Sequence, residues 1–316
     1  MNHDTFQNRS HDRVERTALR VGAAANLVMA VAAWLTYYRS NSEAILLDGN
    51  YSFIMFLGML VALAIARIRS RRTETFPLGL YFSESLYGFI KGLMMIGIIT
   101  MAVVTSVVRI VFYIVGTTEN IPMLNPDPIL YYALAMALIC MGLSLFYRAQ
   151  NRRINNRSII LSTDARASFV DGVLSLGIAA GVFLLRNTDP AGSAGFVPFL
   201  ADSIITLILA TMLIGKPISI VREAVIELAG GVAQNRDDRT AIEAVLRHET
   251  AEPLVYRESY ISKTGSRYLV IATVSVPESG GSITVEIIEA ARRRVIDALG
   301  ARFPHVIVEF ILRPAA

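Results

Sequence analysis

The sequence predicts an α-helical membrane protein with six transmembrane helices, followed by a small cytosolic α+β domain of ferredoxin-like αββαβ order. Three observations lead to this prediction. The 316-residue chain is 53% hydrophobic with a mean hydropathy of +0.49, which is too apolar for an ordinary soluble protein. Its first two thirds contain six apolar stretches of about 18 residues or more, the length that a helix needs to cross a bilayer. The last third is charged and mixed in character.

The six stretches define a transmembrane domain at residues 17–215, preceded by a polar cytosolic tail at residues 1–16 that we expect to be mobile. We expect the spans at residues 17–37, 44–66, 82–113, 128–147, 159–185 and 197–214.

The distribution of arginine predicts the orientation in the membrane. Two loops are rich in arginine, whereas the loop Gly116–Asp127 contains no Lys or Arg; the arginines are Arg67, Arg69, Arg71 and Arg72 in one loop and Arg148, Arg152, Arg153 and Arg157 in the other. By the positive-inside rule both termini are cytoplasmic. We expect a multi-pass protein of a bacterial inner or plasma membrane. The pI is near 9.3 because most of the excess basic residues lie beside the membrane spans, where they contact the lipid bilayer. No nucleic-acid partner is therefore expected.

The chain after the sixth span predicts a linker helix at residues 216–235 and a dimerisation domain at residues 236–316. We expect a helix at 238–248, strands at 254–263 and 267–276 joined by the turn Thr264-Gly265-Ser266, a helix at 283–299 and a strand at 305–312. Three strands leave a sheet face or edge uncovered, so we expect a homodimer.

One local pattern occurs twice in the membrane spans. DGNYSFIM at Asp48–Met55 and DARASFVD at Asp164–Asp171 share the form D-x-x-x-S-F-[I/V]-x. The Asp, the Ser and the last residue are spaced i, i+4 and i+7, which is one helix face. A charge such as Asp48 inside an apolar span is costly and therefore indicates function. The two helices are interpreted as the two halves of one site.

These motifs and their order resemble the cation diffusion facilitator, or cation efflux, family. LLDGNYSFIM is similar to the family's L-A-D-G-x-H-S-x-x-D, and STDARASFVD is similar to its A-D-A-x-H-S-x-x-D. Phe76-Pro77-Leu78-Gly79 followed by Ser83-Glu84 resembles H-P-F-G-x-x-x-x-E, and Asp202 matches an acidic residue that opens the sixth helix. The resemblance implies a proton-coupled antiporter that exports a divalent cation (zinc, iron, manganese, cobalt or cadmium) as a homodimer, and not an enzyme.

The resemblance places the family's four transport ligands at Tyr51, Met55, Ala167 and Asp171. Zinc takes four ligands from His, Asp, Glu and Cys, and of these positions only Asp171 supplies one. The candidate metal ligands are therefore Asp171, Asp48, Asp164, Tyr51, Ser52 and Ser168.

Each of these residues also has a structural interpretation. Asp171 is either a cation ligand or proton acceptor, or a carboxylate that pairs with a cation from another helix. The serines offer oxygen ligands or allow close helix packing. Met55 could favour monovalent copper, although we favour packing because it lies beside aspartates and we assign it no thiolate or second Met.

A lysine within the third span, Lys91, adds a further candidate. It lies seven residues after Glu84 on the same helix face, and a lysine at depth needs a partner or loses its proton. The partners considered are Asp171, Asp48 and Glu84; the alternative is that Lys91 extends to the interface. Lys91, Glu84 and Asp202 are candidates for a proton or counter-ion role.

Two functions remain open from the sequence. The first is proton-coupled efflux of a divalent cation through a non-standard site between helices two and five. The second is a non-transporting relative that acts as a regulatory or partner subunit. The sequence shows no nucleophile–base set, His cluster or phosphate loop, so neither an enzyme nor a bound cofactor is expected.

Overall fold

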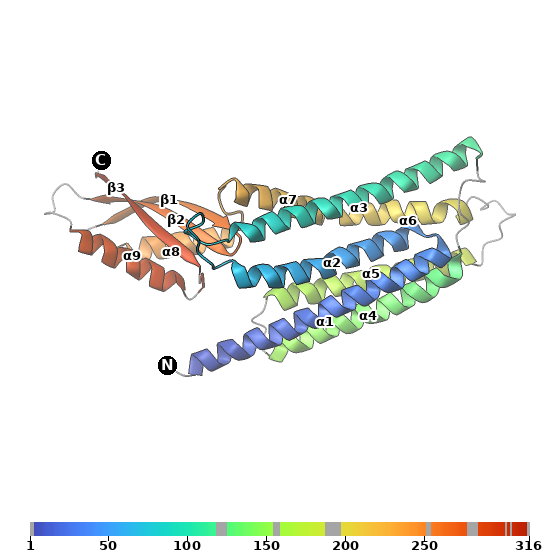
Figure 1. Ribbon diagram of the computed structural model, residues 1–316, viewed down its shortest axis with the longest axis horizontal. Coiled ribbons are helices and arrows are strands. Elements are labelled where there is room, and N and C mark those ends of the chain that lie inside the picture. Colours follow the sequence, from blue (N-terminus) through green and yellow to red (C-terminus); the bar gives the residue numbers. More distant parts are fainter. Residues whose placement is uncertain are drawn as a thin grey trace. The chain divides into compact units, whose positions relative to one another are not determined.

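The computed structural model describes residues 3–117, 125–153, 159–186, 197–250, 254–276, 284–300, 302–303 and 305–314. It consists of two compact units. One, here called the membrane unit, comprises Met1–Val61 and Leu93–Pro217. The other, here called the C-terminal unit, comprises Ala62–Gly92 and Ile218–Ala316. Figure 1 labels the helices and strands of both.

Within the described residues, six helical stretches are long and apolar enough to cross a membrane, as the sequence predicted; the sixth, Leu200–Leu228, includes residues of both α6 and α7. The first six helices are α1 (His3–Ser40), α2 (Glu43–Ile68), α3 (Phe82–Val115), α4 (Pro126–Arg153), α5 (Ile159–Arg186) and α6 (Val197–Leu213). Helix α1 extends beyond the predicted span into the tail, because the chain is helical from His3 onward, and the mobility of the tail stays a prediction. Extending an existing helix costs far less than starting one, so a polar segment can continue the helix of the span that follows it.

Small residues allow close contact between helices of the membrane unit. Helices α4 and α5 pack along each other, and α1 packs on α4. A Cβ atom at Gly172 of α5 would lie 3.4 Å from the Cβ of Cys140 in α4. A Cβ at Gly49 of α2 would lie only 2.6 Å from the Cβ of Ala33 in α1. Lipid supplies no hydrophobic force between helices, so such close packing is a main source of their association.

The C-terminal unit contains the predicted α-β-β-α-β order, and each element lies within a few residues of its expected position. Its elements are α7 (Gly215–Leu228), whose first residues belong to the membrane unit, α8 (Arg236–Glu249), β1 (Val255–Thr264), β2 (Arg267–Val276), α9 (Val285–Gly300) and β3 (Val306–Pro314). The sheet order is β1-β2-β3, with β1 and β2 antiparallel and β2 and β3 parallel.

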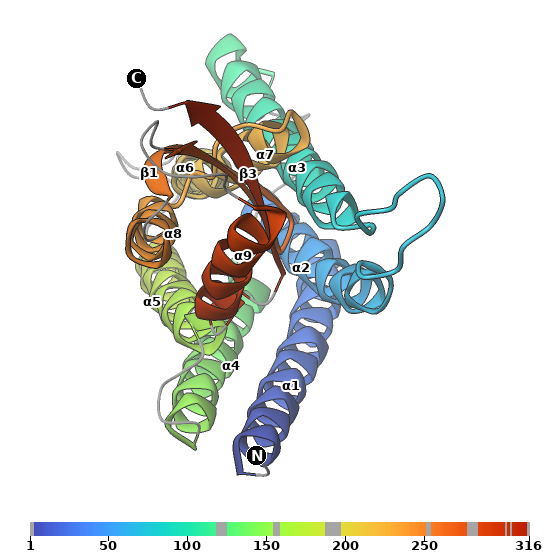
Figure 2. The ribbon, with the colours of Figure 1, turned by 90° about the vertical axis from the view of Figure 1, so that its left-hand side faces the viewer.

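Helices α8 and α9 lie side by side on one face of this sheet, as Figures 1 and 2 show. Alternate residues of β2 face these helices, and the core is formed by Ile242, Leu246, Val270, Ala272, Val295, Leu299 and Val308. On the opposite face Tyr260 and Ile311 are 40% and 47% exposed. Charged Glu309 and Arg313 lie on the same face, and the homodimer stays a prediction.

The β-hairpin turn is held against helix ends within the same unit. Gly265 has a φ of +59°, and a Cβ there would lie 2.5 Å from the backbone oxygen of Tyr81. Its N–H donates to Ser85 Oγ at 2.9 Å and to Glu227 Oε2 at 3.0 Å. Glycine is required at this turn both for the backbone conformation and for the space.

Candidate functional site

The membrane unit encloses a cavity of about 160 Å³, lined by residues from α1, α2, α4, α5, α6 and the start of α7. All four positions that the family pattern marks as transport ligands line it: Tyr51, Met55, Ala167 and Asp171. Helices α2 and α5 therefore present their matching faces to one space, as the repeated motif predicted. Their role as metal ligands stays a prediction.

The flanking polar residues of both motifs line the same cavity. Asp48 and Ser52 come from α2, and Asp164 and Ser168 come from α5. The i, i+4 and i+7 spacing explains this arrangement, because it places each set on one side of its helix. Both serines are buried, and Asp48 and Asp164 are half-buried.

The carboxylates of Asp48 and Asp171 differ in their surroundings. The hydroxyl of Tyr132, from α4, donates to Asp48 Oδ2 at 2.5 Å, which fixes the position of the Asp48 carboxylate. Asp171 is exposed, and Lys216 at the start of α7 lines the same cavity. The role of Asp171 as a cation ligand or proton acceptor stays a prediction.

The hard ligands do not form a standard zinc site. Within the described part of the chain, no group of three or more His, Cys, Asp or Glu side chains is placed to hold a metal ion. Zinc sites in proteins usually have four such ligands, or three and a water. Any cation held here must use other donors as well.

Glu84 and Lys91 both belong to the C-terminal unit, and neither is among the described residues that line the cavity. Arg69 Nη1 lies 2.7 Å from Glu84 Oε1, and the backbone N–H of Ser266 donates to Glu84 Oε2. Glu84 therefore anchors the β-hairpin turn. Lys91 is half-buried, and the cavity cation is Lys216 instead.

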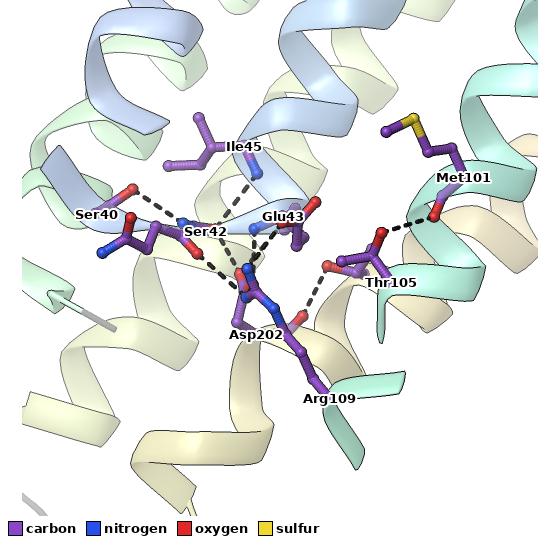
Figure 3. A network of polar contacts seen from close by, with 11 residues as sticks. Ser40, Ser42, Glu43, Ile45, Met101, Thr105, Arg109 and Asp202 are labelled. Atoms are coloured by element: carbon purple, nitrogen blue, oxygen red, sulfur yellow. Dashed lines mark hydrogen bonds and ion pairs between the residues drawn. The ribbon is translucent and has the colours of Figure 1, made fainter. Parts of the chain in front are cut away.

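Asp202 lines the cavity and belongs to a buried polar network at the start of α2 (Figure 3). Its Oδ1 accepts from Ser42 Oγ at 2.5 Å, and its Oδ2 accepts from the Glu43 N–H at 2.7 Å. A carboxylate at this place satisfies free N–H groups and interacts favourably with the helix dipole. Asp202 thus acts as a cap for α2, supplied by α6.

Arg109 of α3 completes this network, and the sequence analysis missed it. Its Nη2 lies 2.8 Å from Glu43 Oε1, and its Nη1 lies 3.3 Å from Asp202 Oδ2. The signal was present, because a single arginine interrupts the apolar run at residues 101–115. Such a charge requires a partner within the membrane.

Sulfur atoms form the second feature that the sequence analysis missed. Besides Met55, the cavity is lined by Met29 of α1, Met59 of α2, and Met136 and Cys140 of α4. The sequence analysis overlooked Met59, which lies four residues after Met55 on the same helix. The full set comes from three helices, so no single local motif contains it.

Comparison with known families supports these observations. The family model for the cation efflux transmembrane domain matches residues 19–229. The search of curated proteins found no match.

Proposed function

Because the chain belongs to the cation efflux family, we propose that this multi-pass membrane protein exports a metal cation in exchange for protons through the cavity of the membrane unit. The observation that carries the proposal is the meeting of α2 and α5, whose Asp48 and Asp171 line one cavity. The family match supports cation transport in general. The efflux direction, the coupling to protons and the residues involved are our own proposal.

Asp171 is the residue we assign to both the cation and the proton. A deprotonated carboxylate binds a cation, and the protonated form releases it. If access to the cavity alternates between the two sides of the membrane, this competition produces antiport. Asp48, fixed by Tyr132, supplies a second oxygen ligand, and Tyr51, Ser52, Asp164 and Ser168 are the further candidates.

We assign the remaining charged candidates no direct role in cation binding. Asp202 and Glu84 already bind backbone N–H groups and arginines, so we assign them to the architecture of the protein. Lys216 is the cation we propose as counter-ion to Asp171 when the cavity holds no metal.

The side chains at the four family ligand positions support a second candidate function. Two of the four family ligand positions, Met55 and Ala167, offer neither oxygen nor nitrogen ligands from their side chains. A non-transporting relative that serves as a partner or regulatory subunit would lose these ligands without consequence. We propose it as the alternative. The uncovered sheet face supports a homodimer in either case.

Transport into proteoliposomes tests the proposal. The full chain is reconstituted with an internal indicator, a pH gradient is imposed, and uptake of zinc, manganese, iron, cobalt, cadmium and silver is followed. We expect flux of at least one ion that depends on the gradient and falls at least about 10-fold in Asp171→Asn, because the variant cannot lose a proton.

The matched control is Asp127→Asn, which changes an acidic residue at the start of α4 outside the lining of the cavity. Cation flux that does not depend on the pH gradient would exclude proton antiport. The absence of flux for every ion, in protein that is folded by thermal unfolding, would favour the non-transporting alternative.

A further inference from the structure

Among the described residues, five sulfur-containing side chains line the cavity, in addition to its carboxylates. They are Met29, Met55, Met59, Met136 and Cys140. Three of them, Met29, Met136 and Cys140, also pack together in one buried cluster, in which each is at most 8% exposed. Met136 and Cys140 are spaced i, i+4 on α4, so their side chains share one face of that helix.

The sulfur atoms of Cys140 and Met29 lie close enough together to bind one metal ion. The thiol of Cys140 donates a hydrogen bond to Met29 Sδ at a sulfur–sulfur distance of 3.8 Å. Two sulfurs that each bind a metal at about 2.3 Å in a tetrahedral arrangement are about 3.8 Å apart. The same cysteine lies beside α5, because a Cβ at Gly172 would be 3.4 Å from its Cβ. The sulfur pair is thus next to the helix that carries Asp171.

The chemistry of these donors selects a class of ion. Thioethers and thiols are soft ligands, which bind monovalent copper in preference to hard divalent ions. Thioethers are also neutral, so they do not offset the charge of the ion that they bind. Because the cost of removing an ion from water rises with the square of its charge, a divalent ion costs about four times as much as a monovalent one of the same size.

We propose that the cavity binds a soft monovalent metal ion, cuprous copper or silver, between the sulfur atoms of Met29, Met136 and Cys140. The proposal rests on the transport function proposed above and names its substrate class. Met55 and Met59, spaced i, i+4 on α2, offer further sulfur ligands along the same cavity. The ion then passes within one cavity from sulfur donors to the carboxylate of Asp171.

Silver binding to the purified full chain tests this proposal, because silver(I) needs no reductant. We expect one tightly bound silver ion per chain by calorimetry. X-ray absorption of the cuprous form should show sulfur neighbours at about 2.3 Å. The double variant Met29→Leu/Met136→Leu preserves volume and removes two thioethers. It should weaken silver binding by at least the roughly 10–100-fold that loss of an outer-shell partner costs a metal site, because it removes ligands directly.

Two further variants make the result decisive. Cys140→Ser should weaken binding at least as much, with Cys140→Ala as a second variant if the serine protein is unstable. Met101→Leu, which changes a methionine of α3 that is 69% exposed, should bind silver like the wild type. If the double methionine variant binds silver normally while Cys140→Ser does not, the ligand is a single thiol and the proposal is wrong.

The outcomes separate this proposal from the transport proposal. Zinc or manganese flux that depends on Asp171, without tight silver binding, would overturn the soft-ion site and leave antiport standing. Silver binding through the sulfurs without flux of any ion would overturn transport and leave the site standing.

Discussion

The guanidinium group of Arg109 contacts two carboxylates that are themselves buried. Its side chain is 11% exposed, and those of Glu43 and Asp202 are 9% and 6% exposed. Three helices, α2, α3 and α6, each contribute one charge (Figure 3). Removal of one charge from such a buried cluster lowers the stability of the protein strongly, because the remaining charges stay buried without their partner. This loss is larger than the net contribution of the intact cluster to stability.

Replacement of Arg109 by Met should therefore destabilise the protein by about 3–5 kcal/mol. The reason is that Glu43 and Asp202 are left as two adjacent buried carboxylates. Thermal unfolding of the full chain in detergent measures the effect. Arg109→Lys is the matched control, since it keeps the charge, and should lose less. Equal stability of Arg109→Met and wild type would show that these carboxylates are adequately solvated.

Tyr268 in the C-terminal unit carries a second prediction at this scale. Its hydroxyl donates to Asp238 Oδ2 at 2.7 Å, and burial together with this hydrogen bond raises the pKa of Tyr268. Tyr268→Phe should lower stability by about 1 kcal/mol at neutral pH. Because the pKa of Tyr268 is higher in the folded than in the unfolded protein, its hydrogen bond contributes fully to stability below the ordinary tyrosine pKa of about 10. That contribution is lost as the pH rises above this value.

The difference between the two proteins should therefore shrink as the pH rises above about 10. Denaturant unfolding of wild type and Tyr268→Phe, followed in parallel over this range, checks the sign. A difference that grows with pH would contradict the assignment.

The residues of the site could be predicted in part. Asp48, Asp171 and their neighbours were found because a local motif occurs twice. Met29, Met136 and Cys140 could not be found, because an apolar helix gives methionine the same pattern as leucine. Asp202 was identified, but its role as a cap for α2 required the tertiary structure. Arg109 was detectable from sequence as a lone charge.

At the scale of helices, the contact between α1 and α2 leads to a prediction about packing. Gly49→Ala places a Cβ 2.6 Å from the Cβ of Ala33, so one helix must shift. Overpacking of this kind costs about 1–3 kcal/mol. The unfolding temperature of the full chain should fall accordingly, and Ala33→Gly in the same protein should restore much of the loss.

Gly97 of α3 provides the control for this experiment. No atom lies within 4 Å of a Cβ built there, as far as the structure is described. Gly97→Ala should be neutral or stabilising by up to about 1 kcal/mol, because alanine favours the helix. A loss of stability in Gly97→Ala equal to that in Gly49→Ala would show that the contact with Ala33 is not the cause of the loss.

The elements themselves followed closely from the sequence. Length and hydropathy identified the six spans, and alternation of apolar residues identified β2 at Arg267–Val276 with its observed bounds. The N-terminal extension of α1 to His3 was not predicted, because a polar composition does not show how far a helix continues beyond its membrane span. Which helices touch depends on small residues such as Gly49, whose neighbours are distant in sequence.

For the whole molecule, the distribution of arginine predicts that both termini are cytoplasmic. Single cysteines at Arg71 and Thr117, both exposed, report the two sides. A membrane-impermeant thiol reagent applied to intact cells should label Thr117→Cys and leave Arg71→Cys unlabelled until the cells are opened. Wild type is the control, because Cys140 is 6% exposed and should react slowly. The reverse labelling would invert the orientation.

The cap that α6 supplies to α2 has a consequence for biosynthesis. Asp202 follows Ser42 by 160 residues, so α2 enters the membrane long before its acceptor has been synthesised. Chains emerge from the ribosome N-terminal end first. Until α6 is inserted, the first N–H groups of α2 lack this carboxylate. A nascent chain halted before residue 202 should therefore remain incompletely folded and be a target for membrane proteases, so that the sixth span completes the protein and releases it from quality control.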